Sequence, residues 1–208
     1  MLAPAQTLDE VLRSVTALLT GSGYKKSARS FVAQADGVAR VIQFQTSQLK
    51  KPDEASFTLG LSVTATAFHE AFTGAAFPKN AGSAEPVVQA EVGRLMPDGE
   101  PVWWSLKPGV SSALIAKEVA ALLKDPVLPF LARFGNEAAL LDELTRGAAL
   151  PGFVAIRDRC RAVLLAKRGR KKEAAGVLAA LLEKNSADGL EGFRDSVHAL
   201  AKRIGVKP

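Results

Sequence analysis

The sequence predicts an α+β fold: an antiparallel β-meander sheet of about five strands with an N-terminal helix and flanking helices, followed by an all-helical C-terminal segment. Apolar residues recur at helical spacing from residue 7 to 20, alternate with polar residues between 31 and 106, and return to helical spacing from 111 onward. The predicted strands are joined by short links without crossover helices, which favours an antiparallel arrangement.

The first predicted element is an amphipathic helix over residues 7–20. Its leucines and valines recur every three or four positions. Thr7 is the expected N-cap, and Glu10 stands three residues later, as in a capping box. We expect Gly21 to end this helix.

Alternating residues then predict strands at 31–35, 38–47 and 56–66. The first two strands are separated only by Asp36-Gly37, which favours a type I′ hairpin turn because both positions need a positive φ. In the third strand, large apolar residues alternate with Ser, Thr and Gly, as expected when one sheet face packs on a core.

The next stretch mixes loops and strands. Residues 69–72 are expected to form a short helical turn, and the Gly- and Pro-rich stretch 74–86 a loop. Strands are predicted at 87–96 and 102–106. The link between them, Pro97-Asp98-Gly99, is typical of a tight turn.

From residue 111 the pattern is helical. Helices are predicted at 111–123, with Ser111 or Ser112 as cap, at 126–134 after Asp125-Pro126, and at 136–146; three more are predicted at 153–168, 171–184 and 190–204. The first two of these last three helices resemble a single hairpin of the tetratricopeptide type.

Positive charge is concentrated at the C-terminal end of the sequence. The 208 residues carry 27 Lys/Arg and 21 Asp/Glu, a formal net charge of +6. Residues 151–208 alone carry 13 Lys/Arg and 6 Asp/Glu, whereas residues 1–150 have a net charge of −1. Pro151-Gly152 lies at the point where the net charge changes sign. We therefore predict an α+β domain over 1–150 and a basic helical extension over 151–208.

Several classes of protein are disfavoured. With one cysteine and two histidines, the chain offers neither a disulfide framework nor a zinc-ligand pattern, and it lacks the common nucleotide-binding and hydrolase motifs. We therefore assign no cofactor, no metal and no catalytic residue. No apolar run could span a membrane and no secretion signal is evident, so we expect a cytoplasmic protein. His69 and Cys160 are expected to be structural.

A candidate ligand-binding surface lies on the sheet. If the strands align, amide, basic and aromatic side chains would share the face opposite the core, where they could orient a polar ligand or contact a partner. The candidates are Arg29, Gln43, Gln45, Arg94, Trp103 and Trp104. Because adjacent strand residues point to opposite faces, at least one tryptophan is expected in the core, and the alternative is a merely solvated face.

A second candidate surface lies on the basic helices. Its residues are Arg157, Arg161, Arg168, Arg170, Lys171 and Lys172. Such clusters attract phosphate backbones, although cations near helix C-termini also interact favourably with the helix dipole. We therefore keep three alternatives open: a solvated or protein-docking face, nucleic acid or another polyanion, and an anionic membrane surface.

Residues 7–146 resemble an uncharacterised bacterial family, domain of unknown function 4304. The resemblance is carried by Gly23-Tyr24-Lys25-Lys26, Arg29 to Phe31, Val41 to Gln45, Leu59 to Leu61, Arg94 and Trp103-Trp104, in that order. It implies a fold rather than a reaction, because the family carries no established activity.

We favour a non-catalytic binding or interaction module that recognises a protein partner or polar ligand through the sheet face or the helical tail. One alternative is polyanion binding by the basic helices. The other is an enzyme with a polar pocket on the sheet face.

Overall fold

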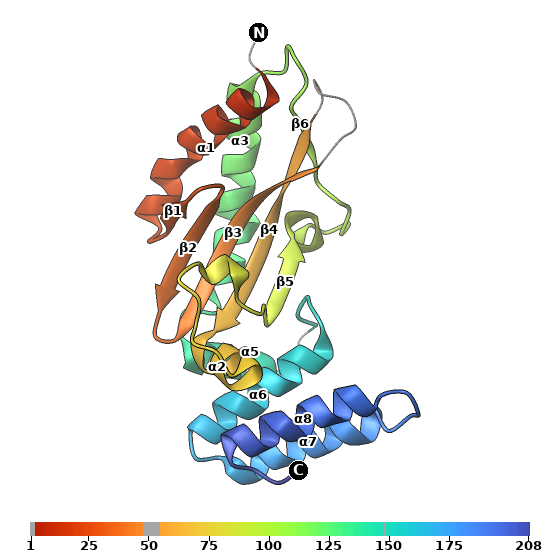
Figure 1. Ribbon diagram of the computed structural model, residues 1–208. Helices are drawn as coiled ribbons and strands as arrows, with labels where there is room; N and C mark the ends of the chain where they lie inside the picture. Colours follow the sequence, from red (N-terminus) through yellow and green to blue (C-terminus); the bar gives the residue numbers. More distant parts are fainter. Residues whose placement is uncertain (1–2, 48–54, 148) are drawn as a thin grey trace. The chain divides into compact units, whose positions relative to one another are not determined.

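A computed structural model describes residues 3–47, 55–147 and 149–208. It contains an N-terminal helix, an open antiparallel sheet and a series of C-terminal helices (Figure 1), which confirms the predicted α+β class. The described residues divide into two compact units. Unit 1 comprises Met1–Gln34, Arg40–Ser62 and Gln89–Arg133; unit 2 comprises Ala35–Ala39, Val63–Val88 and Phe134–Pro208. The domain boundary expected at Pro151-Gly152 stays a prediction.

Helix α1, Pro4–Gly21, begins earlier than the sequence predicts. Proline is favoured at the first helical position, and the Gln6 side chain accepts a hydrogen bond from the Ala3 N–H at 2.9 Å. Thr7 therefore lies inside the helix, where its hydroxyl donates to the Ala3 carbonyl at 3.3 Å, and its predicted capping role is wrong. The helix ends at Gly21, as predicted.

The sheet follows α1. Its strands are β1 (Lys25–Ser27), β2 (Ser30–Ala35), β3 (Val38–Ser47), β4 (Ser56–Ala65), β5 (Val88–Glu91) and β6 (Trp104–Ser105). They are ordered β1-β2-β3-β4-β5, with β6 also paired to β4. Asp36 and Gly37 both have positive φ values, 44° and 78°, which confirms the hairpin turn. The short strand β1 was not predicted, because its three residues are all exposed and show no alternation.

The predicted strand 87–96 is too long. Strand β5 ends at Glu91, and the chain continues as a 3₁₀ helix, η2 (Val92–Leu95). Strand β6 pairs with β4, with Phe57 opposite Trp104 and Ser56 opposite Ser105. Consequently β5 and β6 are not two arms of a hairpin around 97–99, although that turn forms: the Asp98 carboxylate accepts from the Glu100 N–H at 3.2 Å.

Gly93 explains where β5 ends. A Cβ atom added at Gly93 would lie 2.0 Å from the Glu100 carbonyl oxygen, so only glycine allows the chain to fold back this closely. By contrast, a Cβ at Gly60 in β4 would meet the side-chain amide of Gln45, at 2.3 Å from its nitrogen.

Alanine substitutions at these two glycines should differ in their effect on the free energy of unfolding. Gly93→Ala should lower the free energy of unfolding by about 1–3 kcal/mol, because backbone has to move. Gly60→Ala should lower it by less than about 1 kcal/mol, because the Gln45 side chain can rotate and alanine suits a strand better than glycine. Urea unfolding of both variants measures the difference, and equal losses would contradict the assignment of the Gly93 contact.

One face of the sheet in unit 1 carries the core. Helix α3, Ser112–Leu122, lies beside α1 on this face (Figure 1). The ring of Phe44 lies 6.1 Å from that of Phe31 and 5.7 Å from that of Phe57, so aromatic contacts run across the central strands. The Ser111 hydroxyl caps α3 by accepting from the Leu114 N–H at 3.4 Å, as expected.

The helical backbone after α3 is interrupted at Asp125, where the sequence predicts a new helix to start. Both residues lie inside a π-helical segment, η3 (Leu123–Val127), where Asp125 has a non-helical φ of −152°. Helix α4, Leu128–Ala132, follows directly. The extended Asp125 interrupts the helix as an N-cap residue does, and Pro126 is the first helical residue after it, so the predicted helix start at Asp125-Pro126 is confirmed.

Unit 2 is mainly helical. Its elements are α2 (Thr66–Thr73), the 3₁₀ turn η1 (Ala81–Ser83), α5 (Glu137–Thr145), α6 (Val154–Lys167), α7 (Lys171–Lys184) and α8 (Glu191–Ile204). The Asn136 side chain caps α5 by accepting from the Ala139 N–H at 2.9 Å. The three basic helices form as predicted, whereas the tetratricopeptide resemblance of the first two stays a prediction.

Candidate functional site

The face of β3 and β4 opposite the core is lined by amides and hydroxyls. Residues alternate across a strand, so Phe44 and Phe57 point to the core while Gln45 and Thr58 point away. The Ser47 and Ser56 hydroxyls are 2.6 Å apart, which ties the two strands together on this second face. Since this contact sets the strands opposite one another, the antiparallel alternation places Gln45 beside Thr58.

The tryptophan pair divides between the two faces. Trp104 is 6% exposed; its indole N–H donates to the Glu118 carboxylate at 3.0 Å, and its ring stacks on Phe57 at 5.1 Å. Trp103 is 45% exposed. Continuing the β4–β6 register by one residue places Trp103 opposite Thr58, on the face away from the core.

The expectation that one tryptophan is in the core is thus confirmed, and Trp104 is that residue. It is removed from the candidate surface, because its ring is stacked in the core and its N–H is already bonded. The remaining surface, which we call the polar sheet face, consists of Gln43, Gln45, Ser47, Ser56, Thr58 and Trp103. All its members belong to unit 1.

Two features leave hydrogen-bonding capacity on the polar sheet face. The Gln45 side-chain amide donates to the side-chain oxygen Oε1 of Gln43 at 3.3 Å, which leaves further donor and acceptor positions on both side chains. The Thr58 hydroxyl is fully buried and has no hydrogen-bond partner among the residues that the structure describes. A buried hydroxyl without a partner is energetically unfavourable.

Neither of the two arginines assigned to this surface lies within a strand. Arg29 is exposed in the turn between β1 and β2, and its carbonyl accepts from the Phe44 N–H at 2.9 Å. Arg94 is exposed in η2 and does not share a strand with Val88, which corrects the predicted placement. The correction follows from the fold-back at Gly93, which takes the chain out of the sheet before Arg94.

The family model described as "Domain of unknown function (DUF4304)" matches residues 15–133, more than half of the chain. The chain belongs to the DUF4304 family. No curated protein and no solved structure matches it. The DUF4304 match contains every residue of the polar sheet face and ends before the basic helices, so the helices are a feature of this chain outside the matched region.

The histidine and the cysteine singled out in the sequence of this DUF4304 protein, His69 and Cys160, are both buried. His69 is buried; its Nδ1 accepts from the Glu85 N–H at 3.4 Å, and its ring meets Phe77 edge-on. Cys160 is fully buried in α6, and burial raises the pKa of its thiol well above the usual range. Across residues 3–47, 55–147 and 149–208, no group of three His, Cys, Asp or Glu could hold a metal, and no helix is apolar and long enough to cross a membrane.

The six basic candidates do not form one uniform surface. Arg157 donates to the Leu150 carbonyl, and Arg161 is half-buried with its Nε enclosed. Arg170 forms an exposed ion pair with Glu173 at 2.7 Å, which raises the pKa of the arginine and lowers that of the glutamate. Arg168, Lys171 and Lys172 are exposed at the α6–α7 turn.

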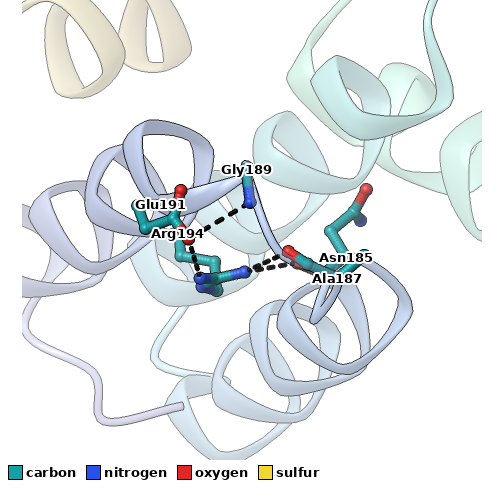
Figure 2. A network of polar contacts seen from close by, with 5 residues as sticks. All are labelled: Asn185, Ala187, Gly189, Glu191 and Arg194. Carbon is teal, nitrogen blue, oxygen red and sulfur yellow. Dashed lines mark hydrogen bonds and ion pairs between the residues drawn. The ribbon is translucent and has the colours of Figure 1, made fainter.

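Sequence reasoning missed the arginines that hold helix ends together. Figure 2 shows Arg194 of α8, which donates to the carbonyls of Asn185 and Ala187 at 3.3 and 2.8 Å and pairs with Glu191 at 3.2 Å. The N–H groups of Glu191 itself and of Gly189, together with Arg194, lower the pKa of the Glu191 carboxyl. The result is a closed link between α7 and α8, because carbonyls at a helix end need donors.

A second arginine acts in the same way at the end of α2. Arg203 donates to the Ala71 and Phe72 carbonyls at 2.9 and 2.7 Å. The only sequence signal was its position in the last turn of a helix, where cations are favoured in any case. Part of the positive charge of residues 151–208 is therefore engaged in hydrogen bonds to backbone carbonyls within unit 2.

Proposed function

We propose that this DUF4304 domain is a non-catalytic module that binds a protein partner through the polar sheet face. The observation that carries the proposal is the exposure of Trp103 beside amides and hydroxyls, while its neighbour Trp104 is in the core. Tryptophan is enriched at the centres of protein interfaces, where truncation costs most.

The surroundings of Trp103 suit a peptide surface. Gln43 and Gln45 retain donor and acceptor positions, and interfaces typically surround an aromatic anchor with polar groups that form direct or water-mediated bonds. A binding role is favoured over catalysis because the chain's two histidines, His69 and His198, lie in α2 and α8 and not on the strands of this face.

The test compares two exposed apolar residues of unit 1. Immobilised wild type, Trp103→Ala and Leu114→Ala are used to capture proteins from a cell lysate, and a protein retained by the wild type is then titrated against all three. Trp103→Ala should weaken its binding at least tenfold, since losing a central interface tryptophan costs about 2 kcal/mol or more.

Leu114→Ala is the matched control, because Leu114 is 64% exposed on α3. It should leave binding unchanged, and both variants should unfold within about 0.5 kcal/mol of wild type. If every retained protein bound Trp103→Ala as tightly as wild type, the proposal would be wrong.

A further inference from the structure

We propose that one end of the C-terminal helices binds the phosphodiester backbone of duplex nucleic acid, independently of base sequence. This end is formed by the α6–α7 turn and the C-terminus of α8. It lies wholly in unit 2 and outside the matched family region, so it is separate from the polar sheet face.

The α6–α7 turn concentrates positive charge on exposed positions. Five of the six residues 167–172 are Lys or Arg, and all six are exposed. The C-terminus of α8 lies against this turn, because a Cβ at Gly205 would be 3.5 Å from the Lys171 ammonium. Lys202 and Lys207, both exposed, therefore add their charges to the same end.

Two of these cations are already neutralised. Lys167 pairs with Glu137 at 2.7 Å, and Arg170 pairs with Glu173 at 2.7 Å while Asp142 also attracts it. We call the remaining five residues the basic end: Arg168, Lys171, Lys172, Lys202 and Lys207. Within the part of the chain that the structure describes, none of these five forms an ion pair with a carboxylate.

The helix dipole does not account for this cluster. Arg168 and Lys202 lie at the C-terminal ends of α6 and α8, where cations are favourable. Lys171 and Lys172 instead open α7, where the dipole disfavours them. They also stand beside other cations, so the arrangement is unfavourable in the free protein and becomes favourable when an anionic partner is bound.

The residue types around the basic end favour a nucleic-acid duplex over a single strand or a membrane surface. Residues 167–172 and 202–207 contain no aromatic side chain on which an unpaired base could stack, which favours a duplex backbone over a single strand. They also lack the exposed Trp, Phe or Leu with which basic amphipathic helices enter a membrane surface.

The test is fluorescence anisotropy of a labelled DNA duplex of about 20 base pairs with the full chain at several salt concentrations. We expect a Kd of about 10⁻⁴ to 10⁻⁶ M that rises steeply with salt. Contacts from three to five cations give a slope of log K against log salt of about −2.7 to −4.5. The triple variant Arg168→Glu, Lys171→Glu, Lys172→Glu should abolish binding.

The matched control is Arg13→Glu, Lys117→Glu, Lys124→Glu, three exposed cations of unit 1. It brings the formal net charge from +6 to 0, as the first triple variant does, and should retain most of the binding. Circular dichroism checks folding. If the glutamate variant does not fold, Lys171→Ala, Lys172→Ala should still weaken binding by at least about tenfold at low salt.

Three results would overturn the proposal: no binding at about 50 mM salt, an equal loss in both triple variants, or binding only to phosphatidylserine vesicles. Trp103→Ala should bind DNA as the wild type does, so failure at this site is distinguishable from failure at the polar sheet face.

Discussion

Replacing Phe57 by alanine should lower the free energy of unfolding by about 3–5 kcal/mol, among the largest losses expected for one substitution here. Phe57 is fully buried, and its ring lies 5.7 Å from that of Phe44 and 5.1 Å from that of Trp104, stacked on both. Removing the ring leaves a cavity between two other rings and also removes two aromatic contacts, each worth about 0.5–1.5 kcal/mol beyond burial.

Urea unfolding followed by circular dichroism measures this loss, and tryptophan emission reports on the stack itself. Phe57→Leu keeps most of the apolar volume and should cost clearly less than Phe57→Ala. Leu114→Ala removes an exposed side chain and should stay within about 0.5 kcal/mol of wild type. Similar losses for Phe57→Ala and Leu114→Ala would show that the stack does not hold unit 1 together.

The central strands could be predicted from the sequence because a strand's side-chain period is fixed. The alternation over residues 56–66 separates Phe57 from Thr58, and the structure places them on opposite faces as expected. The Asp36-Gly37 turn was equally predictable, since few residue pairs accept two positive φ values. In these cases a local rule determines the geometry.

The edge of the sheet could not be predicted in the same way. Whether Trp103 or Trp104 enters the core depends on the pairing of β6 with β4, which joins residues about 50 positions apart. The end of β5 depends on the contact between Gly93 and the Glu100 backbone. The alternation of residues along the sequence shows neither the pairing of β6 with β4 nor the end of β5. Arg94 was therefore assigned to β5, although that strand ends at Glu91.

For the basic helices, the sequence did not predict which of the cations form bonds within the protein. Composition gave their net charge correctly, but it could not show which cations are bonded within the protein. Arg194 and Arg203 donate to carbonyls at helix ends, whereas the exposed Lys171 and Lys172 form no ion pair with a carboxylate of the described residues. Guanidinium groups can donate several bonds in a fixed plane, so arginines near helix ends are the ones most readily drawn into such contacts.

Replacing Arg159 by alanine should be the most damaging change in the C-terminal helices, lowering the free energy of unfolding by about 2–4 kcal/mol. Arg159 is 5% exposed in α6, and its guanidinium carbon lies 4.4 Å from the Phe193 ring and 5.4 Å from the Phe72 ring. One Nη donates to the Ser196 hydroxyl at 2.6 Å. Alanine would leave a cavity where α2, α6 and α8 meet.

Two further substitutions separate packing from charge. Within the described part of the chain, the buried Nε of Arg159 has no hydrogen-bond partner, and desolvation lowers the pKa of the guanidinium, so its charge is poorly compensated. Arg159→Met keeps an unbranched side chain between the rings and removes that charge, so it should recover at least half of the stability lost in Arg159→Ala. Arg159→Lys keeps the charge but cannot stack as a plane and should recover less, because the ammonium is more strongly hydrated. Urea unfolding of the three variants orders them, and a lysine variant more stable than the methionine variant would show that the cation, rather than the stacked side chain, joins these helices.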